Sequence, residues 1–123
     1  MDENLIKSLF ETFIKALNER DFREVVKSFH LNLLYCPFPF PSHRRVMLDY
    51  EALRNHSINL IAESGDSFKG TIGRIYTRSN GDALVYWEYS YTQVLGKKKV
   101  EGVECAVINL RDNLISYYAP VRQ

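Results

Sequence analysis

Two glutamates, Glu88 and Glu104, stand in two long strand-like segments of the sequence, where they could perform acid–base chemistry. The segments cover residues 82–95 and 98–110, and a turn around Gly96 joins them. Because side chains on a strand alternate between two faces, a hairpin centred near Gly96 places both glutamates on one face, roughly opposite each other. Carboxylates that share a poorly hydrated pocket repel each other, which raises at least one pKa toward neutrality. The spacing therefore predicts a general acid and base.

Tyrosines near these glutamates could complete such a site. Tyr86 or Tyr118 could donate a hydrogen bond to an oxyanion as it develops, so Tyr118 joins the two glutamates as a predicted catalytic residue. A purely structural role is the alternative interpretation. In that case each glutamate pairs with a cation such as Arg74 or Lys99, or meets solvent at the mouth of the fold.

The composition is that of one ordinary globular domain covering residues 1–123, with 46% apolar and 25% charged residues. A net charge of +1 gives no electrostatic case for binding nucleic acid. Two cysteines, Cys36 and Cys105, lack metal-ligand spacing, so we predict a reducing compartment and no metal. No phosphate-loop pattern occurs, and we predict no organic cofactor. No apolar run approaches about 20 residues and the first residues are not basic, so we expect a cytoplasmic protein with no membrane partner.

Three helices are predicted from apolar periodicity and capping residues. The first covers about residues 3–19, because its apolar residues recur every three or four positions. Asp21 is a good N-cap for a second, shorter helix, whose apolar stripe is Phe22, Val25, Val26 and Phe29. Asp49 caps a third helix that ends near residue 63.

Five strands are predicted. A short apolar strand at 33–36 is stopped by the segment 37–41, whose prolines cannot donate hydrogen bonds into a sheet. The other strands cover residues 67–79, 82–95, 98–110 and 114–121, and an Asn-Gly pair between the first two is a strong hairpin signal. The order α-α-β-α-β-β-β-β predicts an α+β domain with helices packed on one face of a curved antiparallel sheet.

Four short motifs in this order resemble the NTF2-like superfamily, in particular its SnoaL-like and ketosteroid-isomerase-like branch. They are Ala16-Leu17-Asn18-Glu19-Arg20-Asp21-Phe22, Leu34-Tyr35-Cys36-Pro37, Asp49-Tyr50-Glu51-Ala52-Leu53 and Arg111-Asp112-Asn113-Leu114-Ile115. The resemblance covers nearly the whole chain. It implies a cone-shaped α+β barrel, in which the sheet wraps around the N-terminal helices. It also implies a hydrophobic pocket between the first helix and the concave sheet, and a homodimer.

The catalytic positions of ketosteroid-isomerase-like members are occupied differently in this chain. The helix tyrosine of the oxyanion hole corresponds to Phe13, and the aspartate base corresponds to Cys36, immediately before a proline. The acid of the later strand falls near Ala106, or on Cys105 if a loop differs by one residue. The last strand also lacks the carboxylate that SnoaL-type cyclases place there. The familiar mechanisms of both groups are therefore not predicted, whereas the fold and the pocket are.

The family register predicts which side chains face the pocket. It places Tyr86, Glu88, Ser90, Glu104, Ala106, Ile108, Ser116 and Tyr118 on the concave side of the sheet, and Trp87, Tyr89, Tyr91, Val103, Cys105 and Val107 on the convex side. Hydrophobicity alone favours the opposite assignment, because the second set is the more apolar. The two agree if the convex face is buried in a homodimer.

Two classes of function follow. The first is a small-molecule site, for an isomerase, dehydratase or cyclase that uses glutamate acid–base chemistry on an apolar metabolite. Its predicted ligand-binding residues are Phe13, Cys36, Phe38, Tyr86, Ser90, Ala106 and Ser116. The alternative is a non-catalytic module for ligand binding, protein interaction or dimerisation. A glutamate buried in a sizeable cavity favours the first class, whereas a cavity filled by phenylalanines favours the second.

Overall fold

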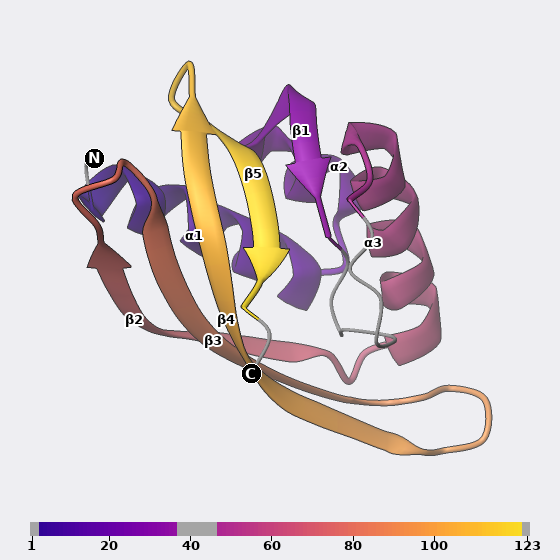
Figure 1. Cartoon of the computed structure of the whole chain (residues 1–123). Helices are drawn as coiled ribbons and strands as arrows, with labels where there is room; N and C mark the ends of the chain where they lie inside the picture. Colours follow the sequence, from indigo (N-terminus) through magenta and orange to yellow (C-terminus); the bar gives the residue numbers. More distant parts are fainter. Residues whose placement is uncertain (1–2, 37–46, 122–123) are drawn as a thin grey trace.

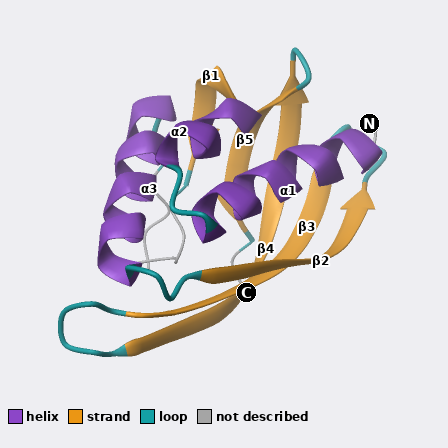
Figure 2. Cartoon of the chain, turned by 180° about the vertical axis from the view of Figure 1, so that it is seen from behind, coloured by secondary structure: helices purple, strands orange, loops and turns teal. Residues whose placement is uncertain are grey.

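The computed structural model describes residues 3–36 and 47–121, which form one curved sheet with three helices on its concave side (Figures 1 and 2). The elements are α1 (Glu3–Asn18), α2 (Phe22–Val25), a 3-10 turn (Val26–Ser28), β1 (Phe29–Tyr35), α3 (Tyr50–Ser64), β2 (Lys69–Thr77), β3 (Ala83–Thr92), β4 (Lys99–Arg111) and β5 (Leu114–Pro120). The α+β class and the order of elements predicted from the sequence are confirmed.

The sheet has the strand order β1-β5-β4-β3-β2. Strands β2 to β5 form antiparallel pairs, as predicted, whereas β1 pairs with β5 in parallel. An entirely antiparallel sheet was therefore the wrong expectation. The parallel pair requires a long connection between β1 and β5, and α3 with the β2–β4 meander supplies it.

Helix α1 lies across the concave face of the sheet (Figure 2). Its apolar stripe is fully covered, with Ile6, Phe10, Phe13 and Leu17 at most 1% exposed. At its C-terminal end the Asn18 side chain accepts a hydrogen bond from the backbone of Gly70 in β2, at 2.8 Å. These contacts fix the helix against one edge of the sheet, so its phenylalanines point into the concave side.

The second helix is shorter than predicted. The side chain of Asp21 caps it by accepting a hydrogen bond from the backbone N–H of Glu24 at 3.3 Å. After one turn the chain tightens into the 3-10 turn, and β1 then begins at Phe29. The assignment of Phe29 to the helical stripe is therefore wrong. Its ring packs at 5.2 Å from that of Phe13, so tertiary burial rather than helical periodicity explains why this position is apolar.

The third helix starts and ends where the capping residues predict. The Asp49 carboxylate accepts a hydrogen bond from the backbone N–H of Ala52 at 3.0 Å. Gly65 ends the helix with a positive φ of 55°, a conformation that glycine adopts at little cost. No helix in the described ranges is long and apolar enough to cross a membrane.

The register of β3 and β4 differs from the predicted one by one residue. Trp87 pairs with Glu104, and Glu88 pairs with Val103. Gln93 donates its backbone hydrogen bond to Lys98, so the turn contains four residues and its centre falls between positions 95 and 96. Because this shift pairs odd positions with even ones, the two glutamates lie on opposite faces of the sheet.

The inner face of β3 is therefore the apolar one. Ala83, Val85, Trp87, Tyr89 and Tyr91 are buried there, at most 9% exposed. Placing Trp87, Tyr89 and Tyr91 on the convex side was wrong, and so was placing Tyr86, Glu88 and Ser90 on the concave side. On β4 the predicted faces are right, because Glu104, Ala106 and Ile108 lie inside and are at most 7% exposed.

Candidate active site

Aromatic rings from four elements form the inner wall of the domain. Phe10 and Phe13 of α1 lie 5.9 and 6.1 Å from the ring of Trp87, and 6.2 and 6.4 Å from that of Tyr118. Tyr35 of β1 completes the wall at 5.7 Å from Tyr118. All five side chains are at most 1% exposed. The wall that these five rings form is therefore apolar, with its polar atoms at the ends of the tyrosine and tryptophan side chains.

Glu104 is the carboxylate that enters this environment. It is 7% exposed and stands opposite Trp87 on the adjacent strand. The Tyr118 hydroxyl donates a hydrogen bond to its Oε1. The indole N–H of Trp87 in turn donates to the Tyr118 hydroxyl oxygen at 3.2 Å. None of the ion pairs in the described part of the chain includes Glu104.

Burial decides the protonation behaviour of this cluster. It raises the pKa of Glu104 to about 7, although the hydrogen bond from Tyr118 and the nearby indole N–H of Trp87 lower it. Burial and the nearby Glu104 carboxylate also raise the pKa of Tyr118 well above its ordinary value, and that of Tyr89 to about 12. The tyrosines therefore stay protonated, and Glu104 exchanges a proton near neutral pH.

The raised pKa of Glu104 thus has one of the two predicted causes, desolvation, and lacks the other. Repulsion between two carboxylates was expected, but Glu88 is exposed on the outer face and its strand neighbours are Thr71 and Val103. Desolvation takes the place of that repulsion. An isolated carboxyl group with a pKa near 7 can act either as a general acid or as a general base at neutral pH.

The predicted cations, Arg74 and Lys99, contact other residues than Glu88 and Glu104. The guanidinium of Arg74 donates to the Tyr76 hydroxyl at 3.2 Å. Lys99 lies 3.8 Å from the carboxylate of Glu101, on an exposed part of the sheet. The interpretation in which Arg74 or Lys99 neutralises one of the two glutamates is therefore wrong, whereas the interpretation in which a glutamate meets solvent is right for Glu88.

Four other predicted site residues lie within the described core or sheet. Phe13 and Ala106 are fully buried on the inner side, and Cys36 is 2% exposed at the end of β1. The backbone N–H of Cys36 donates to the carbonyl of Tyr118 at 2.9 Å, which brings β1 against β5 beside the cluster. Ser116 sits next to the irregularity in the β4–β5 register, and its hydroxyl donates to the Asn109 carbonyl at 3.4 Å.

The remaining predicted ligand-binding residues do not join the inner cluster. Tyr86 lies on the outer face, where its ring packs edge-on against Tyr76 at 5.9 Å. Ser90 pairs with Lys69 and Glu101 on the same outer face. Phe38 lies outside the described residues. Trp87, which sequence reasoning left out of the site, is a member of it, and the apolar alternation of β3 was the signal that could have placed it there.

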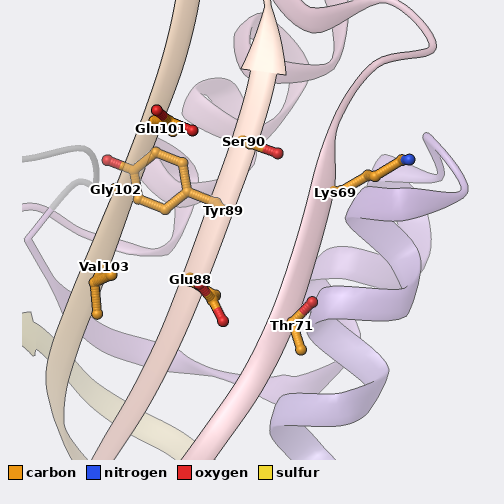
Figure 3. Close-up of a pocket in the computed structure, with 8 residues that line it drawn as sticks. All are labelled: Lys69, Thr71, Glu88, Tyr89, Ser90, Glu101, Gly102 and Val103. Carbon is orange, nitrogen blue, oxygen red and sulfur yellow. The ribbon is translucent and has the colours of Figure 1, made fainter.

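Glu88 belongs instead to a shallow groove of about 370 Å³ on the outer face (Figure 3). Lys69, Thr71, Ser90, Glu101 and Val103 line the groove with it, together with Tyr89 and Gly102. Its side chains are hydroxyls and charges of both signs in open contact with solvent. The carboxylates of the groove, Glu88 and Glu101, are exposed, and burial raises the pKa of its Tyr89 to about 12, so the groove does not support acid–base chemistry near neutral pH. No set of three or more His, Cys, Asp or Glu side chains in the described residues could hold a metal ion.

The comparison with solved structures identifies the class of fold. Over 97% of its length the chain is similar to an NTF2-like protein of unknown function from Exiguobacterium sp. 255-15, with a TM-score of 0.74, 12% identity and 98% of that chain covered. An NTF2-like protein from Anabaena variabilis ATCC 29413 also gives a TM-score of 0.74, at 11% identity over 98% of this chain and 89% of that one. The predicted NTF2-like fold is therefore confirmed.

An enzyme is among the similar structures. The LEH-like epoxide hydrolase of M. tuberculosis matches with a TM-score of 0.68 and 20% identity, over 92% of this chain and 78% of that one. No family model matches the sequence, and no curated protein sequence matches it. At these identities the likeness establishes the fold, and the activity has to be argued from the site itself.

Proposed function

We propose that the chain is a cofactor-independent enzyme that transfers protons to and from a small apolar molecule, with Glu104 as the acid and base. The observation that supports this proposal is a carboxyl group 7% exposed among aromatic rings, with a pKa of about 7. Protein interiors rarely contain a carboxylate without a cation, and strongly perturbed pKa values concentrate at active sites.

The chemistry of the surroundings defines the kind of reaction. At neutral pH both forms of Glu104 are populated, so it could protonate a carbonyl or leaving oxygen and remove a proton from carbon or water. The aromatic wall favours an uncharged, apolar substrate, because no cation in the described interior would compensate an anionic one. Isomerisation, dehydration and cyclisation need only such proton transfers. The hydrolysis of an epoxide, the reaction of one structural neighbour, also needs them.

Deuterium incorporation tests this proposal while the substrate is still unidentified. The purified protein is incubated in D₂O with a collection of apolar carbonyl and hydroxyl compounds, and mass spectrometry detects new products and carbon-bound deuterium. General acid–base catalysis contributes about 10²–10⁴-fold, so Glu104→Gln should lose at least about a hundredfold of any activity found. Glu88→Gln is the matched control and should retain it, because Glu88 is exposed on the outer face. Equal activity in wild type and Glu104→Gln would refute the assignment.

A second role, dimerisation through the convex face, is supported by a set of residues that shares only Val103 with the predicted one. The helices leave this face uncovered (Figure 1), and it carries exposed apolar side chains. They are Leu34, Tyr76, Tyr86 and Val103, with exposed fractions of 54, 46, 36 and 77%. Several large apolar side chains exposed on one face of a sheet are typical of an interface. We propose that a second copy of the chain covers it.

The oligomeric state tests the dimer. Light scattering after size exclusion should give twice the mass of one chain for the wild type, and Val103→Asp should give the monomer. Leu95→Asp is the matched control, because Leu95 is 87% exposed in the turn between β3 and β4 rather than on the sheet face. A monomeric wild type at micromolar concentration would remove the proposal.

A further inference from the structure

We infer that Trp87 and Tyr118 are positioning residues, and that Oε2 of Glu104 is the atom of the cluster that gives and takes the proton. This inference rests on the proposed role of Glu104 as acid and base. It differs from the expectation that Tyr118 is itself a catalytic donor. It also assigns Trp87 a role that the sequence analysis does not predict.

Counting protons fixes the direction of the hydrogen bonds. The indole of Trp87 has one N–H and no acceptor, so it can only donate, and it donates to the Tyr118 hydroxyl oxygen at 3.2 Å. Tyr118 has a single hydroxyl proton, which it donates to Oε1 of Glu104. The proton of Tyr118 is therefore committed, and it cannot be offered to a substrate oxygen while this arrangement persists.

The same count leaves one atom available for proton exchange. Oε1 of Glu104 accepts the Tyr118 proton, whereas Oε2 has no hydrogen bond within the described residues. The side chain keeps 7% of its surface exposed, so the carboxyl group is not completely sealed. Protonation on Oε2 preserves both hydrogen bonds, from Trp87 to Tyr118 and from Tyr118 to Glu104, whereas protonation on Oε1 would break the second. The proton of neutral Glu104 is thus held on Oε2.

Packing prevents the two positioning residues from turning away. Tyr118 is fully buried between the rings of Phe10, Phe13 and Tyr35, at 5.7 to 6.4 Å. Trp87 is 1% exposed and contacts the same two phenylalanines. Rotamers locked in this way hold a hydrogen-bond chain in one geometry.

The titratable groups around Glu104 are few. Tyr118 approaches it from β5 and Tyr89 from β3, and both remain protonated because burial raises their pKa values. Beyond Tyr118 lie Tyr35 of β1 and His56 of α3, whose rings are 6.1 Å apart. Helix α1 contributes only phenylalanines to this wall. A change in the titration of Glu104 therefore reports on Tyr118, which donates to it, and on Trp87, which donates to Tyr118.

The test is a titration of Glu104 by carbon NMR, which needs no substrate. Tyr118→Phe removes only the hydroxyl, and Trp87→Phe removes the indole N–H. Each should raise the pKa of Glu104, by about one unit for Tyr118→Phe, which is a tenfold change in proton affinity. Phe10→Leu is the control, since Phe10 touches both rings without hydrogen-bonding to Glu104. It should leave the titration unchanged.

Two results would overturn the inference. The first is an unchanged titration of Glu104 in Tyr118→Phe. This variant preserves the packing of the ring, so the test remains possible even if Trp87→Phe does not fold. The second is an equal shift in Phe10→Leu, which would show that packing alone is responsible. Where turnover is found, Tyr118→Phe should move the pH profile upward and keep kcat within about tenfold, because the residue only positions. If the titrations change as expected but no turnover is found, the proposed function is refuted, whereas the positioning of Glu104 by Tyr118 and Trp87 is supported.

Discussion

Replacing Glu104 by Gln should stabilise the protein at alkaline pH. In the unfolded chain the carboxyl has its ordinary pKa of 4.5, and in the folded chain burial raises that pKa to about 7. The folded state therefore binds more protons than the unfolded state between these values, so the free energy of unfolding falls as pH rises from 4.5 to 7. At about 1.4 kcal/mol per unit, the ionised carboxylate costs about 3 kcal/mol at pH 8.

Glutamine avoids this cost while preserving the main contact. Its amide is never ionised, and its carbonyl oxygen can still accept the hydrogen bond from Tyr118. We therefore expect Glu104→Gln to be more stable than the wild type by about 2–3 kcal/mol at pH 8, and to match it within about 1 kcal/mol at pH 4.5.

Urea unfolding at half-unit steps between pH 4.5 and 8 measures the difference between the two proteins. Glu88→Gln makes the same chemical change on the outer face, where Glu88 is exposed, and corrects for the effect of net charge. A difference between wild type and Glu104→Gln that stays constant with pH would refute the burial argument. So would a wild type that gains stability, relative to the variant, as pH rises from 5 to 7.

Three further substitutions test other contacts of the fold. Phe13→Ala empties a fully buried position in α1 and should cost about 3–5 kcal/mol in urea unfolding. Asp82→Asn removes a carboxylate whose pKa is lowered by the hydrogen bonds from Arg78, so the wild type should be the more stable protein at pH 7, and this advantage should vanish as pH falls below 3.8. Gly102→Ala places a methyl group 2.8 Å from the Tyr89 hydroxyl, and thermal unfolding should show a loss of about 1–2 kcal/mol.

Most of the fold could be predicted because local signals and tertiary packing agree in the helices. Asp21 and Asp49 cap the helices that they were expected to cap, and the apolar stripe of α1 is the face that the sheet buries. Around Phe29 local and tertiary signals disagree. An apolar residue four positions after Val25 fits a helix and the start of a strand equally well, and only the contact with Phe13 distinguishes the two.

Which side chains share a face at the candidate site depends on the length of the turn between β3 and β4, and the sequence does not determine that length. Gly96 is compatible with a turn centred on it and with a turn centred half a residue earlier. Changing from one turn to the other moves every side chain of β3 to the opposite face relative to β4. Hydrophobic alternation distinguished the two, since it favours Trp87, Tyr89 and Tyr91 inside. The family register contradicts the hydrophobic alternation, and it is the source of the error in placing Glu88.

The correct register makes Glu104 harder to explain as a structural residue. The two inner-face residues that follow it on β4, Ala106 and Ile108, are fully buried and apolar, so packing alone would favour an apolar or neutral side chain at this position. An ionised carboxylate costs about 3 kcal/mol there at pH 8, a substantial part of the roughly 5–15 kcal/mol that typically stabilises a domain. Local violations of this kind are expected where a side chain serves function rather than stability. A Glu104→Gln protein that is both more stable and inactive would show that trade-off directly, whereas one that is more stable and equally active would leave the buried carboxylate without a function.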